Sequence, residues 1–481
     1  MIKSTRTLLF FVLMGLLFVT TACNLQSSET GQEIVIPKDE RLTESDFAIL
    51  IGRKSGLITY LGPNGNIFTT NQAGRSTTSI TTDANLDKVD DLNTAVEAIY
   101  YLLPTWSTSG RKLAFVQHRI TNIKEQDFAR SFQQISFQAQ EQDQNRRTSI
   151  YTIYAADPDG SNQQELWSGT ARPIYMYWAP DGRNLSALLQ DPNASALQFA
   201  LLSTDGESNG SDQFQLLDFG APLYWDWAPH GKQILTHIGS IPSTERVSLL
   251  SLEAQVIEEI LDIAPARFAS PDISPNGQNV MLPLRSDVED DDDTWVSIFD
   301  LNTRKRSVIE KLDGDLFIGG SFSPDSSMVA YIASETTAGP IEGELAIYTL
   351  ATGDLKLSKA KNLIAFFWSP DSSKIAWFEL INQDEGDDSN GRPKFGLHIF
   401  DVESQNIVEL VKPFETTAQF NEVLTFYSQY QRSATIWSPD SRTVSLPVRT
   451  PEGPVIIAMD VSGEIHPRTL APGVLSFWSA E

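Results

Sequence analysis

Two short runs of carboxylates come closest to a grouping that could do chemistry. They are Asp287, Glu289, Asp290, Asp291, Asp292 and Asp293 in one run, and Asp384, Glu385, Asp387 and Asp388 in the other. Oxygen-rich clusters of this kind can bind Ca²⁺. Neither run has the alternating Asp-x-Asp-x-Asp-Gly spacing with a distal Glu that a calcium-binding loop requires. A solvated acidic loop is therefore the simpler interpretation of both runs, and no metal or cofactor is predicted.

The other candidates for catalysis are isolated from one another. The five histidines are His118, His230, His237, His398 and His466, and none of them has the spacing of a metal-binding pair. The sequence contains no Gly-x-Ser-x-Gly elbow, no His-Glu-x-x-His helix and no glycine-rich phosphate loop after a strand. We therefore predict a protein that is not an enzyme. The alternative is a lyase or glycosidase, because carboxylates distant in sequence can converge in space.

The elements that would position these residues are built on a repeated turn. An aromatic residue followed by Ser-Pro-Asp-Ser occurs at Phe322, Trp368 and Trp437, and Trp178 begins the variant Trp-Ala-Pro-Asp-Gly. Ser, Pro and Asp suit the first three positions of a type I turn, and Gly at the fourth accepts a positive φ. An aromatic strand precedes each turn and an alternating apolar strand follows it, so each copy predicts a hairpin.

The period of the repeat predicts the architecture. The first residues of five successive copies are 49, 46, 49 and 46 residues apart: Trp178, Trp227, Ile273, Phe322 and Trp368. A period in the forties, filled by four short strands, is typical of a β-propeller blade. Further copies at Trp106, Trp437 and Trp478 bring the count to eight. We predict an all-β fold, a single closed propeller of eight four-stranded antiparallel blades; seven is the alternative if the Trp106 or Ile273 segment forms no blade.

The two ends of the folded region complement each other. Strands predicted at 48–51, 56–61 and 67–70 follow no motif, whereas the final strand, 473–479, has the motif and no strand after it. We expect the C-terminal strand to complete the N-terminal blade. Such closure removes two exposed sheet edges at once.

Long insertions are predicted to gather on one face. Three lie between the second and third strands of a blade and two lie between blades: 118–147, 285–294 and 381–394, then 71–101 and 413–434. Both acidic runs fall here. Apolar residues at helical spacing, including Phe128 and Phe132, predict helices within 86–99 and 128–139. These helices either pack on their own blades or cap the central channel. Long loops on a rigid scaffold commonly carry binding sites.

The N-terminus has the order of a targeting segment. Lys3 and Arg6 precede the apolar run from Leu8 to Val19, which is shorter than the roughly 20 residues of a bilayer span. Thr20-Thr21-Ala22-Cys23 follows and resembles a bacterial lipoprotein signal, which implies lipidation of Cys23. The alternative is an ordinary cleaved signal peptide. We predict a signal peptide at 1–22, the lipidated Cys23 with a flexible tether to residue 46, and a propeller from 47 to 481.

The repeated aromatic-Ser-Pro-Asp-Gly turn followed by Ile-Ala-aromatic resembles the repeat of TolB-like propellers. Related repeats form the propellers of prolyl oligopeptidase-like enzymes. The resemblance covers nearly all of residues 47–481 and implies protein–protein or ligand binding. This chain departs from TolB itself because it lacks the additional N-terminal α/β domain and has its own lipidation signal.

The net charge of −26 restricts the partners that the protein could bind. A strongly acidic surface disfavours phosphate backbones, so no nucleic-acid partner is predicted. We predict a monomer on the extracytoplasmic side of a bacterial membrane, attached through its lipid only. Its partner would be a protein or peptide, for which a cationic character would suit the acidic runs. It would bind at the face that holds Asp290–Asp293, Asp384–Asp388, Phe128 and Phe132.

Overall fold

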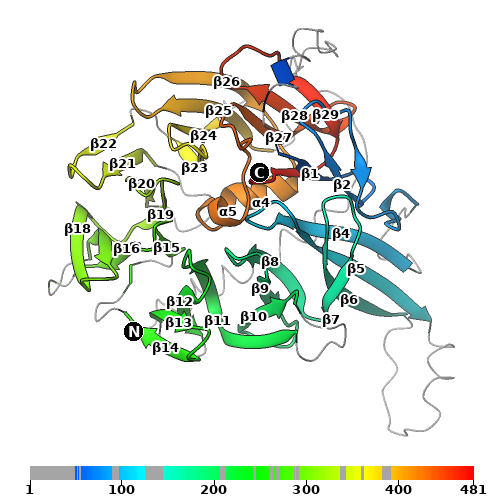
Figure 1. Ribbon diagram of the computed structural model, residues 1–481, viewed down its shortest axis with the longest axis horizontal. Coiled ribbons are helices and arrows are strands. Elements are labelled where there is room, and N and C mark those ends of the chain that lie inside the picture. The colour runs from blue at the N-terminus through cyan, green and yellow to red at the C-terminus, as the bar shows by residue number, and fades with distance from the viewer. Residues whose placement is uncertain are drawn as a thin grey trace, which may run out of the picture.

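The computed structural model describes residues 49–50, 53, 56–88, 97–124, 145–205, 213–241, 245–260, 265–266, 270–286, 288, 292–335, 343–358, 362–381 and 392–481. Nearly all of the regular structure in these ranges is β-strand, in antiparallel sheets arranged radially around two short helices (Figure 1). This confirms the prediction of an all-β protein built from small antiparallel sheets.

Four sheets each contain four strands that are consecutive in the chain. They are β4 (Glu97–Trp106), β5 (Leu113–Lys124), β6 (Asn145–Ala156) and β7 (Gln164–Gly169); β15 (Asp272–Ile273), β16 (Asn279–Arg285), β17 (Thr294–Asp300) and β18 (Lys305–Leu312); β19 (Phe317–Phe322), β20 (Met328–Ser334), β21 (Leu345–Thr349) and β22 (Leu355–Leu357); and β23 (Leu363–Trp368), β24 (Lys374–Ile381), β25 (Lys394–Asp401) and β26 (Ile407–Phe414). In each of them the strand that ends at the repeated motif lies innermost (Figure 1).

One larger sheet joins two such units through a shared strand. Its members are β8 (Arg172–Trp178), β9 (Asn184–Gln190), β10 (Leu197–Ser203), β11 (Phe214–Trp227), β12 (Gln233–Ile241), β13 (Arg246–Ser251) and β14 (Val256–Glu259). The first half of β11 pairs with β10, and its second half, from Ala221 onward, pairs with β12. A single strand is therefore the last strand of one unit and the first strand of the next.

The remaining two sheets contain the ends of the described chain. One holds β27 (Thr443–Thr450), β28 (Gly453–Asp460) and β29 (Arg468–Pro472), and a bridge from Trp437 to Val444 lies at the position of its first strand. The other has the order β3 (Thr78–Ser79), β2 (Ile67–Thr70), β1 (Ile58–Leu61), β30 (Leu475–Trp478). Ile58 lies opposite Trp478 and Leu61 opposite Leu475, which is the pairing of the two ends expected from the sequence.

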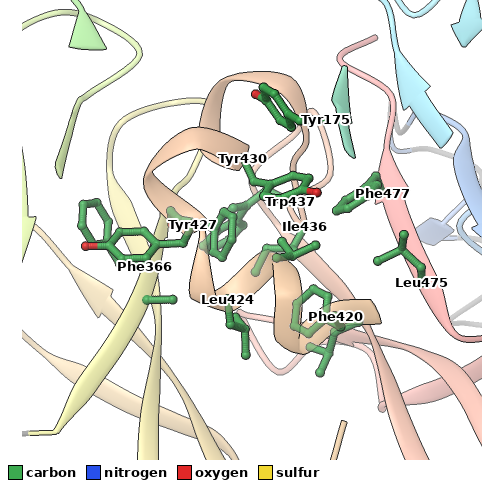
Figure 2. Close-up of a cluster of buried hydrophobic side chains, with 14 of the residues drawn as sticks. Tyr175, Phe366, Phe420, Leu424, Tyr427, Tyr430, Ile436, Trp437, Leu475 and Phe477 are labelled. Carbon is green, nitrogen blue, oxygen red and sulfur yellow. Dashed lines mark hydrogen bonds between the residues drawn. The ribbon is translucent and has the colours of Figure 1, made fainter. Parts of the chain in front are cut away.

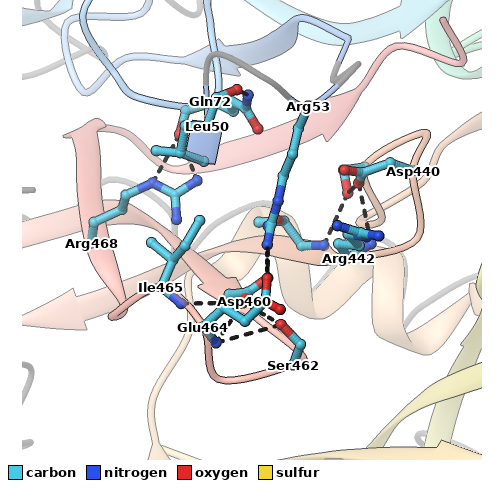
Figure 3. Close-up of polar contacts among 12 residues, drawn as sticks. Leu50, Arg53, Gln72, Asp440, Arg442, Asp460, Ser462, Glu464, Ile465 and Arg468 are labelled. Atoms are coloured by element: carbon cyan, nitrogen blue, oxygen red, sulfur yellow. Dashed lines mark hydrogen bonds and ion pairs between the residues drawn. The ribbon is translucent and has the colours of Figure 1, made fainter. Parts of the chain in front are cut away.

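The strand predicted at 48–51 is wrong, because Ile49 and Leu50 are helical. With β30 in the first place, β1, β2 and β3 complete the sheet and no further strand is needed. The segment instead reaches toward the last sheet, where Arg53 Nη1 lies 2.9 Å from Asp460 Oδ1 (Figure 3). Nearby, Arg468 Nε donates to Gln72 O over 2.9 Å, so polar contacts reinforce this junction.

The repeated turn is a five-residue hairpin connection with a left-handed residue at its fourth position. In the copy at Phe322, Ser326 N donates to Ser323 O over 2.8 Å and Ser323 N donates to Met328 O over 2.9 Å. Ser326, Ser372 and Ser441 have φ of 65°, 62° and 58°, at the position where the copy that begins at Trp178 has Gly182. Each hydroxyl accepts a 3.0 Å bond from the turn of the preceding sheet: from Asn276 N, Asp325 N and Asp371 N respectively. Serine therefore contributes a link between sheets that glycine could not provide.

The motif tryptophans link neighbouring sheets in a second way. Trp178 Nε1 donates to Thr105 O over 3.0 Å, and Trp437 Nε1 donates to Phe367 O over 3.0 Å. In both bonds, the acceptor is the carbonyl of the residue directly before the first residue of the previous copy of the motif. Trp227 reaches the equivalent carbonyl, that of Tyr177, through the hydroxyl of Ser186. A polar atom on a large apolar ring explains why Trp recurs at this position.

Of the two predicted helices, only the ends of the first lie in the described part of the chain. The segment 86–99 contains a short 3-10 helix, Leu86–Lys88, and Ile99 belongs to strand β4. The segment 128–139, with Phe128 and Phe132, lies outside the described residues, and the ends of the 118–147 insertion are paired strand out to Lys124 and Asn145. Helices α4 (Ala418–Thr425) and α5 (Tyr427–Ser433) occur instead in the insertion 413–434.

Candidate functional site

Helices α4 and α5 occupy the centre of the radial array of sheets (Figure 1). Thr417 begins α4 as its N-cap, since its side chain accepts a bond from Phe420 N. Phe420, Val423 and Leu424 of α4 are buried, as are Tyr427 and Tyr430 of α5. This spacing places one apolar side of each helix against the innermost strands. The centre of the array of sheets is therefore occupied by the chain itself.

Aromatic rings hold the two helices in place (Figure 2). Tyr427 packs on Phe366 with ring centroids 5.2 Å apart, and Tyr430 packs edge-on against Tyr175 at 5.2 Å. Tyr427 also donates its hydroxyl proton to Gly319 O over 2.7 Å. Because Tyr175, Gly319 and Phe366 belong to β8, β19 and β23, a single helix turn connects three separate sheets.

Tyr175 fastens the other end of α5. Its hydroxyl lies 2.9 Å from both Gln429 O and Ser433 Oγ. Burial raises the pKa of Tyr175 well above its ordinary value, so the hydroxyl stays protonated as a donor. Thr417 Oγ1 donates to Val474 O, next to β30, so the helical segment also contacts the C-terminal strand.

A buried ionic cluster joins α5 to the innermost strands. Arg432 forms a bidentate pair with Asp272, with Nε to Oδ1 at 2.7 Å and Nη2 to Oδ2 at 2.8 Å. Asp226 lies close by, and Asp226 and Asp272 are 2% and 1% exposed. Two carboxylates thus share one guanidinium in a site from which water is nearly excluded.

The two aspartates make the same contact in successive repeats. Asp226 Oδ2 accepts a 2.7 Å bond from Ile273 N, and Asp272 Oδ2 accepts a 2.5 Å bond from Phe322 N. Each carboxylate therefore binds the backbone of the innermost strand in the next sheet along the chain. Asp226 also accepts a 2.9 Å bond from Trp227 N. The sequence offered one signal for this site, an acid directly before the aromatic position in two consecutive copies.

Burial raises the pKa of Asp226 to about 7; Arg432 opposes this rise and Asp272 adds to it. Tyr177 Oη lies 3.4 Å from Asp226 Oδ1, and burial raises the pKa of that phenol as well. A carboxyl group that titrates near neutrality could act as a general acid in an accessible site. Here it is enclosed, and its oxygens bind backbone N–H groups of two strands. We therefore assign the cluster to the joining of sheets rather than to catalysis.

Only a few of the residues predicted for the binding face belong to the described part of the chain. Asp292 is exposed, and Asp293 accepts a 3.0 Å bond from Gly314 N, which fastens the end of the loop to a neighbouring turn. The others lie outside the described residues: Phe128, Phe132, Asp290, Asp291, Asp384, Glu385, Asp387 and Asp388. The predicted lipidation site, Cys23, lies outside them as well. Among the residues that the structure does describe, no group of three or more His, Cys, Asp or Glu could hold a metal ion.

Three of the histidines are held in separate pairs on different sheets. His118 Nδ1 lies 2.7 Å from Tyr100 Oη, His237 Nε2 lies 3.1 Å from Glu245 Oε1, and His398 Nε2 lies 2.9 Å from Glu379 Oε2. They belong to β5, β12 and β25, so the structure does not bring them together.

This radial array of antiparallel sheets defines the protein as a β-propeller with a helical centre. Comparison of the sequence with protein-family models gives no match, and neither does comparison with curated proteins. In the described ranges, no helix has the length and apolar character needed to cross a membrane.

Solved structures with a similar arrangement have little sequence in common with this chain. TolB from Acinetobacter baumannii is 15% identical over 75% of this chain and 81% of its own, with a TM-score of 0.37. Oligogalacturonate lyase from Vibrio parahaemolyticus is 11% identical over 85% and 97%, with a TM-score of 0.45. The β-propeller domain of the Trilobed protease from Pyrococcus furiosus is 11% identical over 78% and 98%, with a TM-score of 0.43. These likenesses assign neither an activity nor a partner to the chain.

Proposed function

We propose that this protein is a membrane-anchored, extracytoplasmic propeller that binds a protein or peptide partner through the face that holds its long connections. One observation carries the proposal: the two ends of the sheets differ in kind. At one end the repeated turns are short and tied to one another through Ser326, Ser372 and Ser441. The other end holds the long links from β5 to β6, β16 to β17 and β24 to β25.

The same proposal includes eight blades and a closed ring. The shared strand β11 counts once for the unit of β8–β10 and once for the unit of β12–β14, and every other sheet counts as one blade. The pairing of β30 with β1 would be the closure. In domain terms, 1–22 is a signal peptide, Cys23 and the residues to 46 form a lipidated tether, and 47–481 is the propeller.

Electrostatics supports a cationic partner. The net charge is −26, and the runs at 287–293 and 384–388 lie in connections on the proposed binding face. An acidic face attracts a basic peptide during diffusional encounter, mainly by raising the association rate. The described residues offer no observation that favours a lyase or glycosidase over this scaffold, and α4 and α5 fill the centre of the array of sheets.

Site-specific photo-crosslinking in living cells tests which face binds. A photoreactive amino acid would replace Asp292, which is exposed on the proposed binding face, or Pro324, which is exposed on the opposite face. We expect a discrete adduct from position 292 and none from position 324. Adducts from position 324 alone would refute the proposed face, and the loss of the adduct from position 292 in 0.5 M salt would support its electrostatic character.

A further inference from the structure

A polar cleft of about 390 Å³ lies between the sheet that contains β1–β3 and the sheet of β4–β7. None of its lining residues belongs to α4 or α5, but several belong to the insertions 71–101 and 118–147, which we expect on the proposed binding face. One wall is the segment after β3 and the other comes from β4, β5 and β6. The lining residues are Ile80, Thr81, Thr82, Asp83, Tyr101, Gln117, Arg119, Tyr154 and Gln163.

Strand register places four of these side chains on one face of a sheet. Tyr101 lies opposite Gln117, and Tyr154 lies opposite Phe115. Since side chains alternate along a strand, Phe115, Gln117 and Arg119 of β5 project to the same side, together with their paired partners. Arg119, Gln117, Tyr101 and Tyr154 therefore form one continuous wall.

A hydrogen-bonded triangle crosses the cleft and is already assembled. Tyr101 Oη donates to Asp83 Oδ1 over 2.6 Å, and Gln117 Nε2 lies 2.9 Å from Tyr101 Oη and 3.3 Å from Asp83 Oδ2. Tyr101 is 3% exposed and Gln117 is 8% exposed, so neither side chain can reorient without breaking this network. Their positions are set before any ligand arrives.

Apolar packing against a neighbouring ring on the same face of the sheet supports the two tyrosines. The buried ring of Phe115 lies 5.7 Å from Tyr101 and 5.8 Å from Tyr154, measured between centroids. The two sheets are also tied together beside the cleft: Thr69 Oγ1 donates to Pro158 O over 3.0 Å, and Ile99 N donates to Asn85 Oδ1 over 2.8 Å. The cleft is thus a rigid feature of the junction between sheets.

The lining retains both donors and acceptors for a ligand. The Asp83 carboxylate has about four lone-pair positions and uses one on each oxygen within the triangle. Arg119 commits one N–H to Glu97 Oε1 at 2.9 Å and keeps about four more. Asp83 disfavours an anionic ligand, and both of its oxygens are already partly neutralised by donors, which weakens its pull on a cation. A hydroxyl group, which donates and accepts at once, matches this mixture best.

We propose that the cleft binds an uncharged, hydroxyl-rich ligand of the sugar class. Asp83 and the amide oxygen of Gln117 accept from ligand hydroxyls, Arg119 donates to them, and Tyr154 provides a further hydroxyl and a ring face. Buried polar groups that are prearranged for hydroxyls discriminate strongly against analogues that lack them.

Saturation-transfer difference NMR on the intact propeller tests the proposal. The probes are cellobiose, maltose, lactose and N,N′-diacetylchitobiose, with digalacturonate as the charged comparator. We expect at least one neutral disaccharide to bind. Tyr154→Phe and Arg119→Met should each weaken that binding roughly fivefold, the size expected for the loss of one hydrogen bond. Gln117→Leu, which breaks the triangle, should weaken it further.

Tyr348→Phe is the matched control, because Tyr348 occupies the third strand of another sheet and its removal should leave binding unchanged. Binding of none of the four neutral probes would overturn the proposal. So would equal affinity in wild type, Tyr154→Phe and Arg119→Met, or tighter binding of digalacturonate than of every neutral probe. Since Tyr154 and Arg119 are partly exposed, both variants should fold, and their melting temperatures verify this.

Discussion

The most unusual single residue of the propeller is Asp226, a carboxyl group enclosed at the centre with its pKa raised to about 7. Its folded-state pKa exceeds the unfolded value, so the protonated form stabilises the fold. That contribution is complete below about pH 4 and is lost as pH rises through 7. The shift from 3.8 to about 7 corresponds to roughly 4 kcal/mol at most.

We therefore predict that the melting temperature falls between pH 5 and pH 8 and that Asp226→Asn flattens this dependence. The asparagine side chain keeps only one acceptor oxygen. The variant should therefore lose about 1 kcal/mol of stability, because one of the two backbone hydrogen bonds is lost. Thermal unfolding of both proteins across this range measures the effect. Parallel pH profiles would contradict the assignment of the titration to Asp226.

Ser441 combines a left-handed backbone with a bond between sheets, and the two effects can be separated. Ser441→Ala keeps the strain at φ 58° and leaves Asp371 N without its acceptor, so we expect a loss of about 1–2 kcal/mol. Ser441→Gly loses the same bond but relieves the strain, and should be about 1 kcal/mol more stable than the alanine variant. Urea denaturation compares them; equal stabilities would mean that the positive φ is not strained.

At the scale of elements, α5 is predicted to contribute stability through its buried side. Tyr427→Ala should destabilise the protein by about 3–5 kcal/mol, since it opens a cavity among Phe366 and its neighbours and removes the bond to Gly319. The matched control is Phe426→Ala at the adjacent residue, which is 41% exposed and should change stability by less than about 0.5 kcal/mol. If chemical denaturation gives similar losses for both variants, α5 does not pack as described.

The helical centre also marks where sequence reasoning failed. Phe420, Val423, Leu424, Tyr427 and Tyr430 have helical spacing, yet the insertion was expected only as a loop. Conversely, the apolar spacing of 86–99 suited a helix, whereas residues 97–99 at its end pair with β5 as a strand. Local periodicity does not reveal which partner a segment will meet, so short amphipathic segments remain ambiguous.

The repeated turns were predictable because their chemistry is local: proline presets one angle and the hairpin follows from the next few residues. The site at the centre was not predictable in the same way. Arg432 and Asp272 are separated by 160 residues, and nothing near either of them in the sequence indicates the other. The acidic runs, although conspicuous, specify no geometry.

At the scale of the whole molecule, the last strand should be required for stability. Deleting residues 473–481 removes β30 and leaves β1 as an exposed edge, so we predict a lower melting temperature and a tendency to aggregate. A deletion of residues 24–46, the proposed tether, is the control and should leave the melting temperature unchanged. Calorimetry that finds the two deletions equivalent would argue against a contribution from the pairing of the ends.

Membrane attachment is predicted to depend on one atom. Cys23 is the single cysteine of the chain, so its sulfur is the only available site for a thioether-linked lipid. Cys23→Ser should move the protein from the membrane fraction to the soluble fraction after cell lysis. Retention of the serine variant on membranes at the wild-type level would show that something other than this lipid holds the protein there.

The continuous strand β11 has a consequence for how neighbouring sheets can move relative to one another. Most neighbouring sheets are separate ladders joined by a connection, so the angle between them can change through that joint. Between the sheets of β10 and β12 there is no joint, because the same backbone carries both ladders and changes partners at Ala221. We therefore expect these two ladders to move together, so that changes of angle between sheets occur mainly at the other junctions.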